Sequence, residues 1–472
     1  MSVGAQWLID SVVMVSTSYE NLRQQHVREF VARLPEELKH LDWTAEEVRA
    51  ERERRLRILI KTAKERSPWH RERLTGIDPE RLRDEDLASL PTMTKADLMA
   101  NWDAIVTDRR LTLEKVEEHL AGLTTDSYLL DHFHAVASSG STGPRGVFVY
   151  DWEGWLVTGL VSLRTGAKLA AMNADTTPPV IAGVAAERAT HITSAVALTF
   201  SNPARQIHLV PATLPIDEII SRLNELQPTS LGGYASMLQI LAEYARAGRL
   251  RISPRRVVSS AEPMLPEGRR IVEDVWGVRV SNGYGASEGF IASGCPSGGG
   301  HVVEDLIYLE PVDVQGTPVP VGITSDKVFI TNLYNLALPL IRYEITDQVV
   351  WLDQPCDCPW PHRRIGDVQG RLDDVFTYGD VRVHPHVFRS ALSRYKTVTA
   401  YQVRQTAQGA AISVQLIGDL RREDLERDIE DALKKVGLAD PIVSVAPVEA
   451  IERGATGKLK RFVPLRGRAT VG

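Results

Sequence analysis

The stretch S-S-G-S-T-G-P-R-G, Ser138 to Gly146, is followed directly by V-F-V-Y, Val147 to Tyr150, and is the most distinctive run in the chain. Its three glycines let the backbone approach an anion closely, with successive N–H groups turned toward it, and its hydroxyls add further donors. No G-K-[ST] ends the run, and the residues after it predict a strand rather than a helix. The run is therefore not the phosphate loop of a kinase or GTPase. A phosphate-binding loop of another kind and a Gly/Ser hairpin turn both fit it.

The composition is that of a globular protein that binds small molecules. The chain has 472 residues, of which 25% are charged and 43% hydrophobic, with a net charge of -6. This length suffices for about two to four domains with a large core, and the net charge argues against a nucleic-acid partner. Asp10 interrupts the apolar N-terminal run and no basic leader precedes it. We therefore expect no signal peptide, no membrane span and a cytoplasmic location.

The segments around the opening loop predict an α/β core. Residues 1–126 are charge-rich and helical in pattern, with a helix start where Thr94 can cap the first turn and Asp97 can reciprocate. Between about residues 135 and 350, β-rich runs alternate with amphipathic segments such as Ile216 to Leu226. This alternation is typical of an α/β fold with largely parallel sheets.

A smaller α+β unit is predicted after G-R-L-D-D, Gly370 to Asp374. Alternating strands there flank an amphipathic helix over Arg421 to Val436. About a hundred residues is enough for a separate domain. We therefore predict a large N-terminal domain over 1–372 and a small C-terminal lid domain over 373–472.

Two β runs end in turns of small residues, where open α/β sheets place their ligands. These turns are S-S-A-E-P-M, Ser259 to Met264, and N-G-Y-G-A-S-E-G, Asn282 to Gly289. In the second turn Tyr284 can stack on a base, and Glu288 can hold a Mg²⁺ ion that bridges phosphates. A core aromatic and a solvated surface acid are the structural alternatives.

Two later segments carry one charged residue each that suits a nucleotide. L-I-R-Y-E-I-T-D, Leu340 to Asp347, ends in a carboxylate that can accept both hydroxyls of a ribose. G-A-T-G-K-L-K-R-F, Gly454 to Phe462, places Lys458 after a glycine turn, where a mobile cation can meet an anionic transition state. The structural alternatives are a surface acid and an exposed lysine.

Taken in order and spacing, these segments resemble the adenylate-forming ligases, which comprise acyl-CoA synthetases, peptide-synthetase adenylation domains and luciferases. Within that family the chain is similar to the phenylacetate-CoA ligase branch, also in L-P-T-M-T-K-A-D-L at Leu90 to Leu98 and in R-S-P-W-H-R-E-R-L at Arg66 to Leu74. The resemblance spans nearly the whole chain. It implies a large multi-sheet adenylation domain with a small, mobile α+β lid domain.

The resemblance assigns a role to each segment around the nucleotide. The loop that grips the β- and γ-phosphates of ATP corresponds to Ser139, Gly140, Ser141, Thr142 and Gly143, with Thr142 among the catalytic residues. The residues that border the adenine correspond to Ala261, Glu262, Pro263, Tyr284, Gly285, Ala286 and Ser287. The catalytic Mg²⁺ ligand corresponds to Glu288.

Further positions match family residues that bind the ribose, bind the acid or form the hinge of the lid domain. Asp347 and Arg371 correspond to the ribose-binding pair, and Asp373 to the hinge of the lid domain. Lys458 corresponds to the lysine that bridges the carboxylate and the α-phosphate, and Tyr234, in G-G-Y-A-S-M, to a residue of the acyl pocket. The substrate carboxylate itself attacks the α-phosphate in this chemistry. The enzyme therefore supplies no nucleophile; it positions the two reactants and neutralises their negative charge.

The implied activity is ATP-dependent adenylation of a small aromatic acid, possessing an amino or hydroxy substituent or none, with transfer of the acyl group to CoA and release of AMP and pyrophosphate. An adenylating enzyme with a carrier protein or amine as acceptor, or with a nitrogenous or inorganic acid, is the alternative, and the resemblance leaves a homodimer open. A non-catalytic nucleotide- or acyl-binding protein ranks lower, because it predicts losses among Glu288, Asp347 and Lys458, and all three are present.

The three cysteines form a candidate zinc site. Cys295 and His301 make C-x5-H, and Cys356 and Cys358 make C-x-C, which supplies three thiolates and one imidazole for a tetrahedral zinc. From spacing alone, simple burial remains an alternative, and His362 competes with His301 as the fourth ligand. The resemblance to coenzyme F390 synthetase-like members of the branch, which bind zinc there, favours His301. A zinc with four protein ligands is structural.

Three segments depart from the pattern of the family. Pro144 and Arg145 follow the loop one residue early, so the role of Arg145 is open. Val184 to Phe200 replaces a glycine-rich aromatic segment near the acyl pocket, and Val383 to Ser390 lacks the acid that follows the hinge in relatives. Three polar side chains of the former segment fit either an exposed helix face or recognition of a polar substituent on the acid: Glu187, Arg188 and His191.

Overall fold

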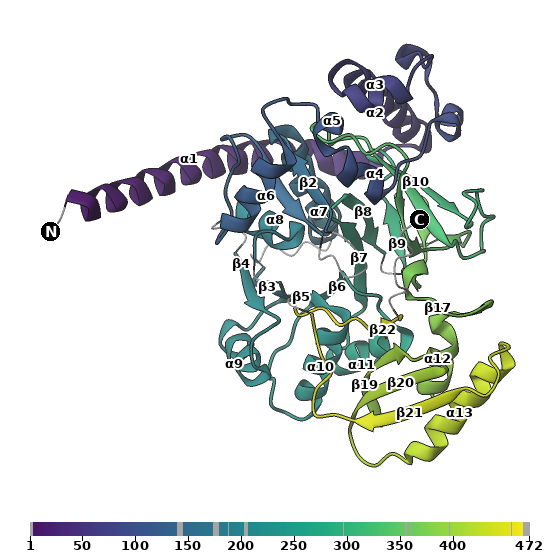
Figure 1. Cartoon of the computed structure of the whole chain (residues 1–472). Coiled ribbons are helices and arrows are strands. Elements are labelled where there is room, and N and C mark those ends of the chain that lie inside the picture. Colours follow the sequence, from purple (N-terminus) through teal and green to yellow (C-terminus); the bar gives the residue numbers. More distant parts are fainter. Residues whose placement is uncertain are drawn as a thin grey trace.

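The structure is a computed structural model of the chain, shown in Figure 1. It describes residues 3–138, 145–172, 179–186, 188–202, 206–295, 297–354, 356–358, 360–395, 397–454 and 456–465. Within these ranges no helix combines the length and the apolar character needed to cross a membrane.

The N-terminal region is helical, as predicted. Its helices are α1 (Val3–Lys39), α2 (Ala45–Arg66), α3 (Pro68–Arg73), α4 (Lys95–Ala100), α5 (Trp102–Ile105) and α6 (Leu113–Gly122). The predicted cap at the start of α4 is confirmed, because the Thr94 side chain accepts from the Asp97 amide and the Asp97 side chain accepts from the Thr94 amide. The start of α1 projects away from the body of the molecule (Figure 1).

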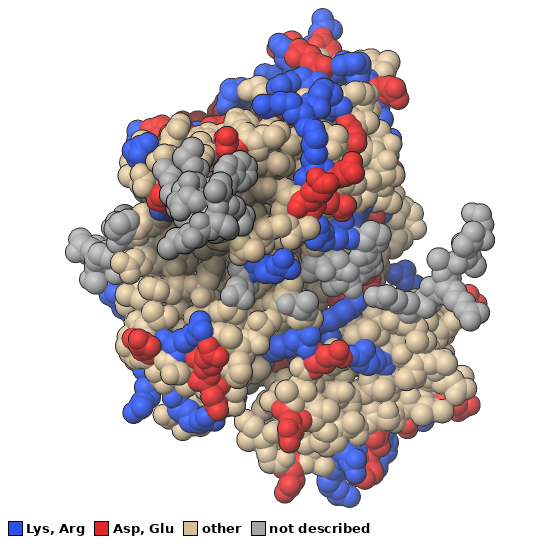
Figure 2. Space-filling model, turned by 60° about the vertical axis from the view of Figure 1, so that its left-hand side comes forward, with Lys and Arg blue, Asp and Glu red and all other residues tan. Residues whose placement is uncertain are grey.

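Basic side chains gather over α2 and α3, at the top of the face shown in Figure 2. Arg54 and Arg55 of α2 both form ion pairs with Glu51, and Arg57 forms one with Glu53. Pairs at this spacing stabilise a solvated helix face.

A nine-stranded sheet with the strand order β14-β15-β9-β8-β7-β6-β5-β3-β4 forms the centre of the large unit. Its parallel half contains β3 (Ile181–Ala185), β4 (Ile207–Pro211), β5 (Ser230–Tyr234), β6 (Arg256–Ser260) and β7 (Val280–Ala286). Its antiparallel half contains β8 (Gly289–Gly294), β9 (Gly300–Val302), β14 (Trp351–Leu352) and β15 (Arg364–Ile365). The predicted parallel pairing holds only for the first half, because a tight turn at Ser287 and Glu288 reverses the chain after β7.

Helices and smaller sheets complete the large unit. The helices are α7 (Trp152–Met172), α8 (Ile192–Phe200), α9 (Ile216–Leu226), α10 (Ala235–Arg246) and α11 (Pro266–Trp276), and α9 has the predicted bounds. The other strands are β1 (His134–Ala137), β2 (Val147–Tyr150), β10 (Ile307–Val312), β11 (Lys327–Asn332), β12 (Tyr343–Ile345), β13 (Asp347–Gln348) and β16 (Gly370–Arg371). Buried side chains of the parallel strands, α9, α10 and α11 form one hydrophobic core, and a second core lies around β1, β2 and α7.

The C-terminal residues form an α+β unit with its own core. The elements are β17 (Phe376–Tyr378), β18 (Val381–Val383), α12 (Pro385–Leu392), β19 (Val398–Gln405), β20 (Gly409–Leu416), α13 (Arg422–Lys435), β21 (Ile442–Pro447) and β22 (Phe462–Val463). Leu425, Ile429 and Leu433 of α13 pack into this core, on the face that the sequence predicts. The division of the chain at residues 372 and 373 stays a prediction. Figure 1 shows this unit below the antiparallel half of the central sheet.

Candidate active site

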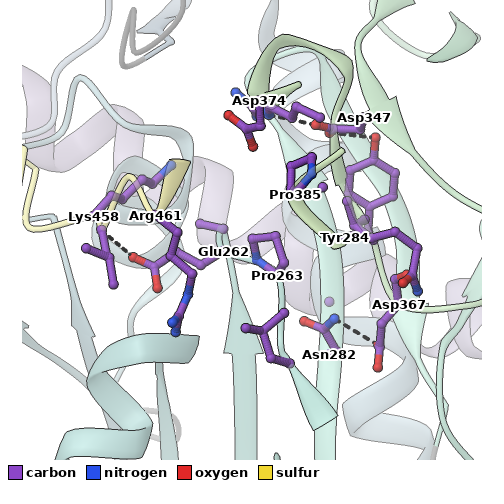
Figure 3. Close-up of a pocket in the computed structure, with 18 of the residues that line it drawn as sticks. Glu262, Pro263, Asn282, Tyr284, Asp347, Asp367, Asp374, Pro385, Lys458 and Arg461 are labelled. Atoms are coloured by element: carbon purple, nitrogen blue, oxygen red, sulfur yellow. Dashed lines mark hydrogen bonds and ion pairs between the residues drawn. The ribbon is translucent and has the colours of Figure 1, made fainter. Parts of the chain in front are cut away.

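A cavity of about 380 Å³ lies between the large unit and the C-terminal unit. The ends of β6 and β7, the β13–β16 pair and the loop before β22 all contribute to its wall (Figure 3). Eight of the predicted site residues line it: Ala261, Glu262, Pro263, Tyr284, Gly285, Asp347, Arg371 and Lys458. Residues from segments almost two hundred positions apart are thus brought to one cavity.

The carboxylate of Asp347 is held at this cavity by two donors. Tyr284 Oη donates to Asp347 Oδ2 at 2.9 Å, and Arg371 Nε donates to Asp347 Oδ1 at 2.7 Å. Asp347 and Arg371 face each other because β13 pairs with β16 in that register. Burial, together with the charge of Asp347, raises the pKa of Tyr284 well above its ordinary value, so its hydroxyl stays a donor. The remaining lone pairs of the carboxylate can accept hydroxyls of a sugar.

The turn after β6 forms the opposite wall. Ala261 has a φ of 63°, in the left-handed region, which is uncommon for a residue other than glycine. This conformation turns Glu262 and Pro263 toward the cavity (Figure 3). The Glu262 carboxylate accepts from the Ser236 amide at 3.0 Å and from the Leu459 amide at 2.6 Å. The carboxylate is thus engaged by two backbone donors in addition to bordering the cavity.

Lys458 enters the cavity from the C-terminal unit. Gly457, which precedes it, has a φ of 78°, and the Gly454 amide donates to the Lys458 carbonyl at 3.0 Å. The Lys458 ammonium lies 5.8 Å from the ring centroid of Tyr234. Burial, and next the charge of Arg371, lower the pKa of Lys458. This half-buried lysine is therefore not one more exposed surface lysine, because it faces the carboxylate-lined cavity.

Tyr234, whose ring faces the Lys458 ammonium, is not among the residues that line the cavity. Its hydroxyl accepts from the Ala186 amide at 2.9 Å and donates to the Thr456 carbonyl at 3.1 Å. His191, near the same region, is half-buried, and burial lowers its pKa to about 4. Arg188 is exposed, which fits the structural alternative, and Glu187 lies outside the described residues.

Glu288 lies in the turn between β7 and β8 and does not line the cavity. Glu288 is 7% exposed, and its backbone carbonyl accepts a hydrogen bond from Asn332 Nδ2 at 2.8 Å. Burial raises the pKa of the Glu288 carboxyl, while the charges of Lys95 and Arg371 oppose the shift. Ala286 and Ser287 do not line the cavity either, and the Ser287 carbonyl accepts from Tyr150 Oη at 2.8 Å. The Mg²⁺ role of Glu288 stays a prediction.

The predicted phosphate loop falls largely outside the described residues, which exclude Ser139, Gly140, Ser141, Thr142, Gly143 and Pro144. Its two ends are described. They close a hairpin in which β1 pairs with β2, and the Gly146 amide donates to Ser138 Oγ at 2.8 Å. The strand expected after the loop is confirmed as β2, and the phosphate role of the loop stays a prediction.

The hinge segment borders the same cavity. Asp373 Oδ2 accepts from Thr346 Oγ1 at 2.8 Å. Asp374, which sequence reasoning missed, lines the cavity, and burial raises its pKa to about 6 against the charges of Arg371 and Lys460. The hinge role of Asp373 stays a prediction.

A polar pair at the lower end of the cavity was also missed. Asn282 Nδ2 donates to Asp367 Oδ1 at 2.9 Å (Figure 3). Arg269 donates to Asp367 Oδ2 at 2.7 Å. The side-chain oxygen of Asn282 is an acceptor at the cavity wall. The run N-G-Y-G contained the signal for Asn282, but nothing local marks Asp367.

Four candidate metal ligands, from directly after β8, from β9 and from the segment between β14 and β15, lie close together. The ligand atoms of Cys295, His301, Cys356 and Cys358 all lie within 4.8 Å of one another. His301 Nδ1 donates to the His362 carbonyl at 2.8 Å, which leaves Nε2 available, 3.4 Å from Cys356 Sγ. A ring nitrogen bonded to a carbonyl is the usual support of a metal-binding histidine.

The geometry distinguishes between the two histidines. The ring of His362 lies 3.9 Å from Asp305 and outside the cysteine cluster. Hydrogen bonds from His301, the Ser297 amide and Arg364 outweigh the effect of burial and lower the pKa of Cys295 to about 6. A thiolate at neutral pH suits a metal ligand. The donor set therefore fits zinc, with His301 rather than His362 as its fourth member.

The chain is similar to known proteins in sequence and in fold. No family model matches the chain. The chain is 27% identical over 474 residues to the phenylacetate-coenzyme A ligase of Thermus thermophilus, covering 89% of this chain and 97% of that protein. It is 31% identical over 200 residues to the phenylacetate-coenzyme A ligase of Pseudomonas putida, covering 40% of this chain and 44% of that protein.

Solved structures share the fold. The 2-hydroxyisobutyryl-CoA ligase in its postadenylation state in complex with 2-HIB-AMP matches with a TM-score of 0.70 at 20% identity, over 91% of this chain and 92% of that chain. The same ligase in its thioesterification state matches with a TM-score of 0.57, over 90% of this chain and 91% of that chain. In sequence the chain is similar to phenylacetate-coenzyme A ligases, and in fold it is similar to the 2-hydroxyisobutyryl-CoA ligase.

Proposed function

We propose that this protein adenylates a small carboxylic acid with ATP and transfers the acyl group to CoA, releasing pyrophosphate and AMP. The observation that carries the proposal is the convergence of Tyr284, Asp347, Arg371 and Lys458 on one cavity. The first three form a connected group suited to a nucleoside, and the fourth is a cation supplied by the other unit. Such an arrangement neutralises charge at a reacting phosphate without a side-chain nucleophile.

Each charged group has a distinct task in this chemistry. Asp347, oriented by Tyr284 and Arg371, accepts the ribose hydroxyls and so fixes the position of the α-phosphate. The Lys458 ammonium lies between the acid and that phosphate and offsets the negative charge that develops as the carboxylate attacks. A Mg²⁺ ion held by Glu288 would neutralise the leaving pyrophosphate. The loop at residues 139–143 would hold its oxygens by backbone N–H groups.

The proposed acid is a small aromatic one with an amino or hydroxy substituent. Two features support this choice. The Lys458 ammonium lies over the ring of Tyr234, which places an aromatic side chain next to the cation that is proposed to meet the acid. The lowered pKa of His191 keeps its imidazole neutral at pH 7, able to donate to or accept from a polar substituent.

We further propose that the cysteine cluster holds one structural zinc. Gly299 and Gly300 lie between Cys295 and His301 and line the cavity, as do Ile365 on the paired strand and Gly366 directly after it. An ion in this cluster would join the loop after β8 to the segment that leads to Arg371. The homodimer stays a prediction from the sequence.

The direct test is a screen of pyrophosphate release over aryl, amino-aryl and aliphatic acids, with product mass spectrometry in the presence and absence of CoA. We expect release with a small set of aryl acids, and an acyl-CoA product only when CoA is present. An acyl product on another nucleophile would favour the alternative acceptor. Tight ATP binding with no release for any acid would favour a non-catalytic nucleotide-binding protein.

A further inference from the structure

The carboxylate of Glu262 connects the large unit to the loop that carries Lys458. One oxygen accepts from the amide of Ser236, the second residue of α10, and the other accepts from the amide of Leu459. The N-cap residue of α10, Tyr234, makes no side-chain capping bond. Glu262 therefore satisfies a helix N-terminus that its own chain segment leaves open, where a negative charge is also favoured by the helix dipole.

Other contacts place the same loop against the same helix end. Arg453 donates to Ser236 Oγ and to the Gly457 carbonyl, both at 2.9 Å. A Cβ added to Gly457 would lie 2.9 Å from the Cβ of Ala212, so the loop fits closely against the large unit at this point. Together with the bond from Tyr234 to Thr456, these contacts hold Arg453, Thr456, Gly457 and Leu459 against the large unit near the N-terminus of α10.

Only one of the two hydrogen bonds that Glu262 accepts depends on the position of the C-terminal unit. The bond from Ser236 lies within the large unit and is independent of where the C-terminal unit sits. The bond from Leu459 exists only while the loop is seated, and Leu459 is the residue directly after Lys458. The carboxylate therefore stabilises one arrangement of the C-terminal unit selectively, and this is the arrangement in which Lys458 reaches the cavity.

We infer that Glu262 is a positioning residue that holds Lys458 in place for adenylation and is released when the C-terminal unit moves for acyl transfer. The inference rests on the proposed function. It goes beyond a role in binding the nucleotide, because it predicts a loss in one half-reaction that is larger than any loss of ATP affinity. Hydrogen bonds to a charged group contribute about 1.5–3 kcal/mol, which corresponds to roughly a 10- to 100-fold change in the seated population.

The test separates the half-reactions in Glu262→Gln. Because one oxygen becomes an amide nitrogen, the side chain can no longer accept from both backbone donors. We expect acid-dependent ATP–pyrophosphate exchange to fall about 10-fold or more in kcat. Thioester formation from a synthetic acyl-adenylate and CoA should stay within about twofold of wild type. Because Glu262 also borders the cavity, ATP affinity is measured alongside, and the fall in exchange should exceed any loss of ATP affinity. Asp274→Asn, an exposed acid on α11, is the matched control and should change none of these.

A second variant and a second readout guard against a folding defect. Arg453→Met removes the other bridge from the C-terminal side without changing α10, and should show the same split between half-reactions. Hydrogen exchange of the peptide that contains Leu459 should be faster in both variants, while the peptide of α13 stays unchanged. Equal loss in both half-reactions, a loss of ATP affinity as large as the loss of pyrophosphate exchange, or unchanged hydrogen exchange at Leu459 would overturn the inference. A wild-type protein inactive with every acid would refute the proposed function instead, and hydrogen exchange would still test the Glu262 contact.

Discussion

Asp347→Asn tests the nucleotide assignment most specifically. The substitution keeps the size of the side chain and leaves one oxygen to accept from Tyr284 or Arg371, so we expect the fold to persist. It removes the negatively charged carboxylate that is proposed to accept hydrogen bonds from the ribose hydroxyls. A hydrogen bond to a charged acceptor contributes about 1.5–3 kcal/mol, so the Kd for ATP should rise by roughly 10- to 100-fold.

Calorimetric titration with ATP and with 2′,3′-dideoxy-ATP checks the cause of this loss. The wild-type protein should bind the dideoxy nucleotide about as weakly as the variant binds ATP, and the variant should discriminate little between the two nucleotides. Asp353→Asn, an exposed acid nearby, serves as the control and should leave the Kd unchanged. If wild type binds both nucleotides equally, or if the variant keeps its preference for the ribose hydroxyls, Asp347 does not hold the ribose.

Three further predictions concern the metal, the loop and pH. Cys356→Ser combined with Cys358→Ser should reduce zinc from about one per chain to none and lower the thermal midpoint, as elemental analysis and calorimetry would report; retained zinc would refute the site. Gly457→Ala should slow adenylation with little effect on ATP affinity, because its φ of 78° and its contact with Ala212 exclude a Cβ; unchanged pyrophosphate exchange would contradict the seating of the loop. Because burial lowers the pKa of Lys458, its charged form is lost at a lower pH than usual. The adenylation rate should therefore fall on the alkaline side below the ordinary lysine pKa of about 10.4, and Lys458→Arg should move this limb to higher pH; a limb unmoved by that change would assign it to another group.

Local signals in the sequence predicted individual elements well. The bounds of α9 follow from its hydrophobic period, and the start of α4 follows from the reciprocal cap between Thr94 and Asp97. The antiparallel half of the central sheet was not predicted. Its strands β14 and β15 have only two residues each, too few for a period to show.

The site residues likewise comprise some that local sequence predicts and some that it does not. Tyr284, Asp347 and Lys458 were predicted as site residues because each lies in a short, recognisable segment, and all three line one cavity in the structure. The bond from Leu459 to Glu262 spans 197 residues, and the bond from Asn282 to Asp367 spans 85. No local pattern reports such contacts, because they depend on how the two units and the irregular segment before the hinge pack together.

The central claim is that Lys458 and the nucleotide group around Asp347 form one adenylating site. Acid-dependent ATP–pyrophosphate exchange tests it most directly, measured in wild type and in Lys458→Ala with the acid that gives the fastest release. Loss of one preorganised cation at a developing charge costs roughly a 100- to 1000-fold reduction in rate, so the variant should show exchange near background while still binding ATP. Full exchange in Lys458→Ala would contradict the account.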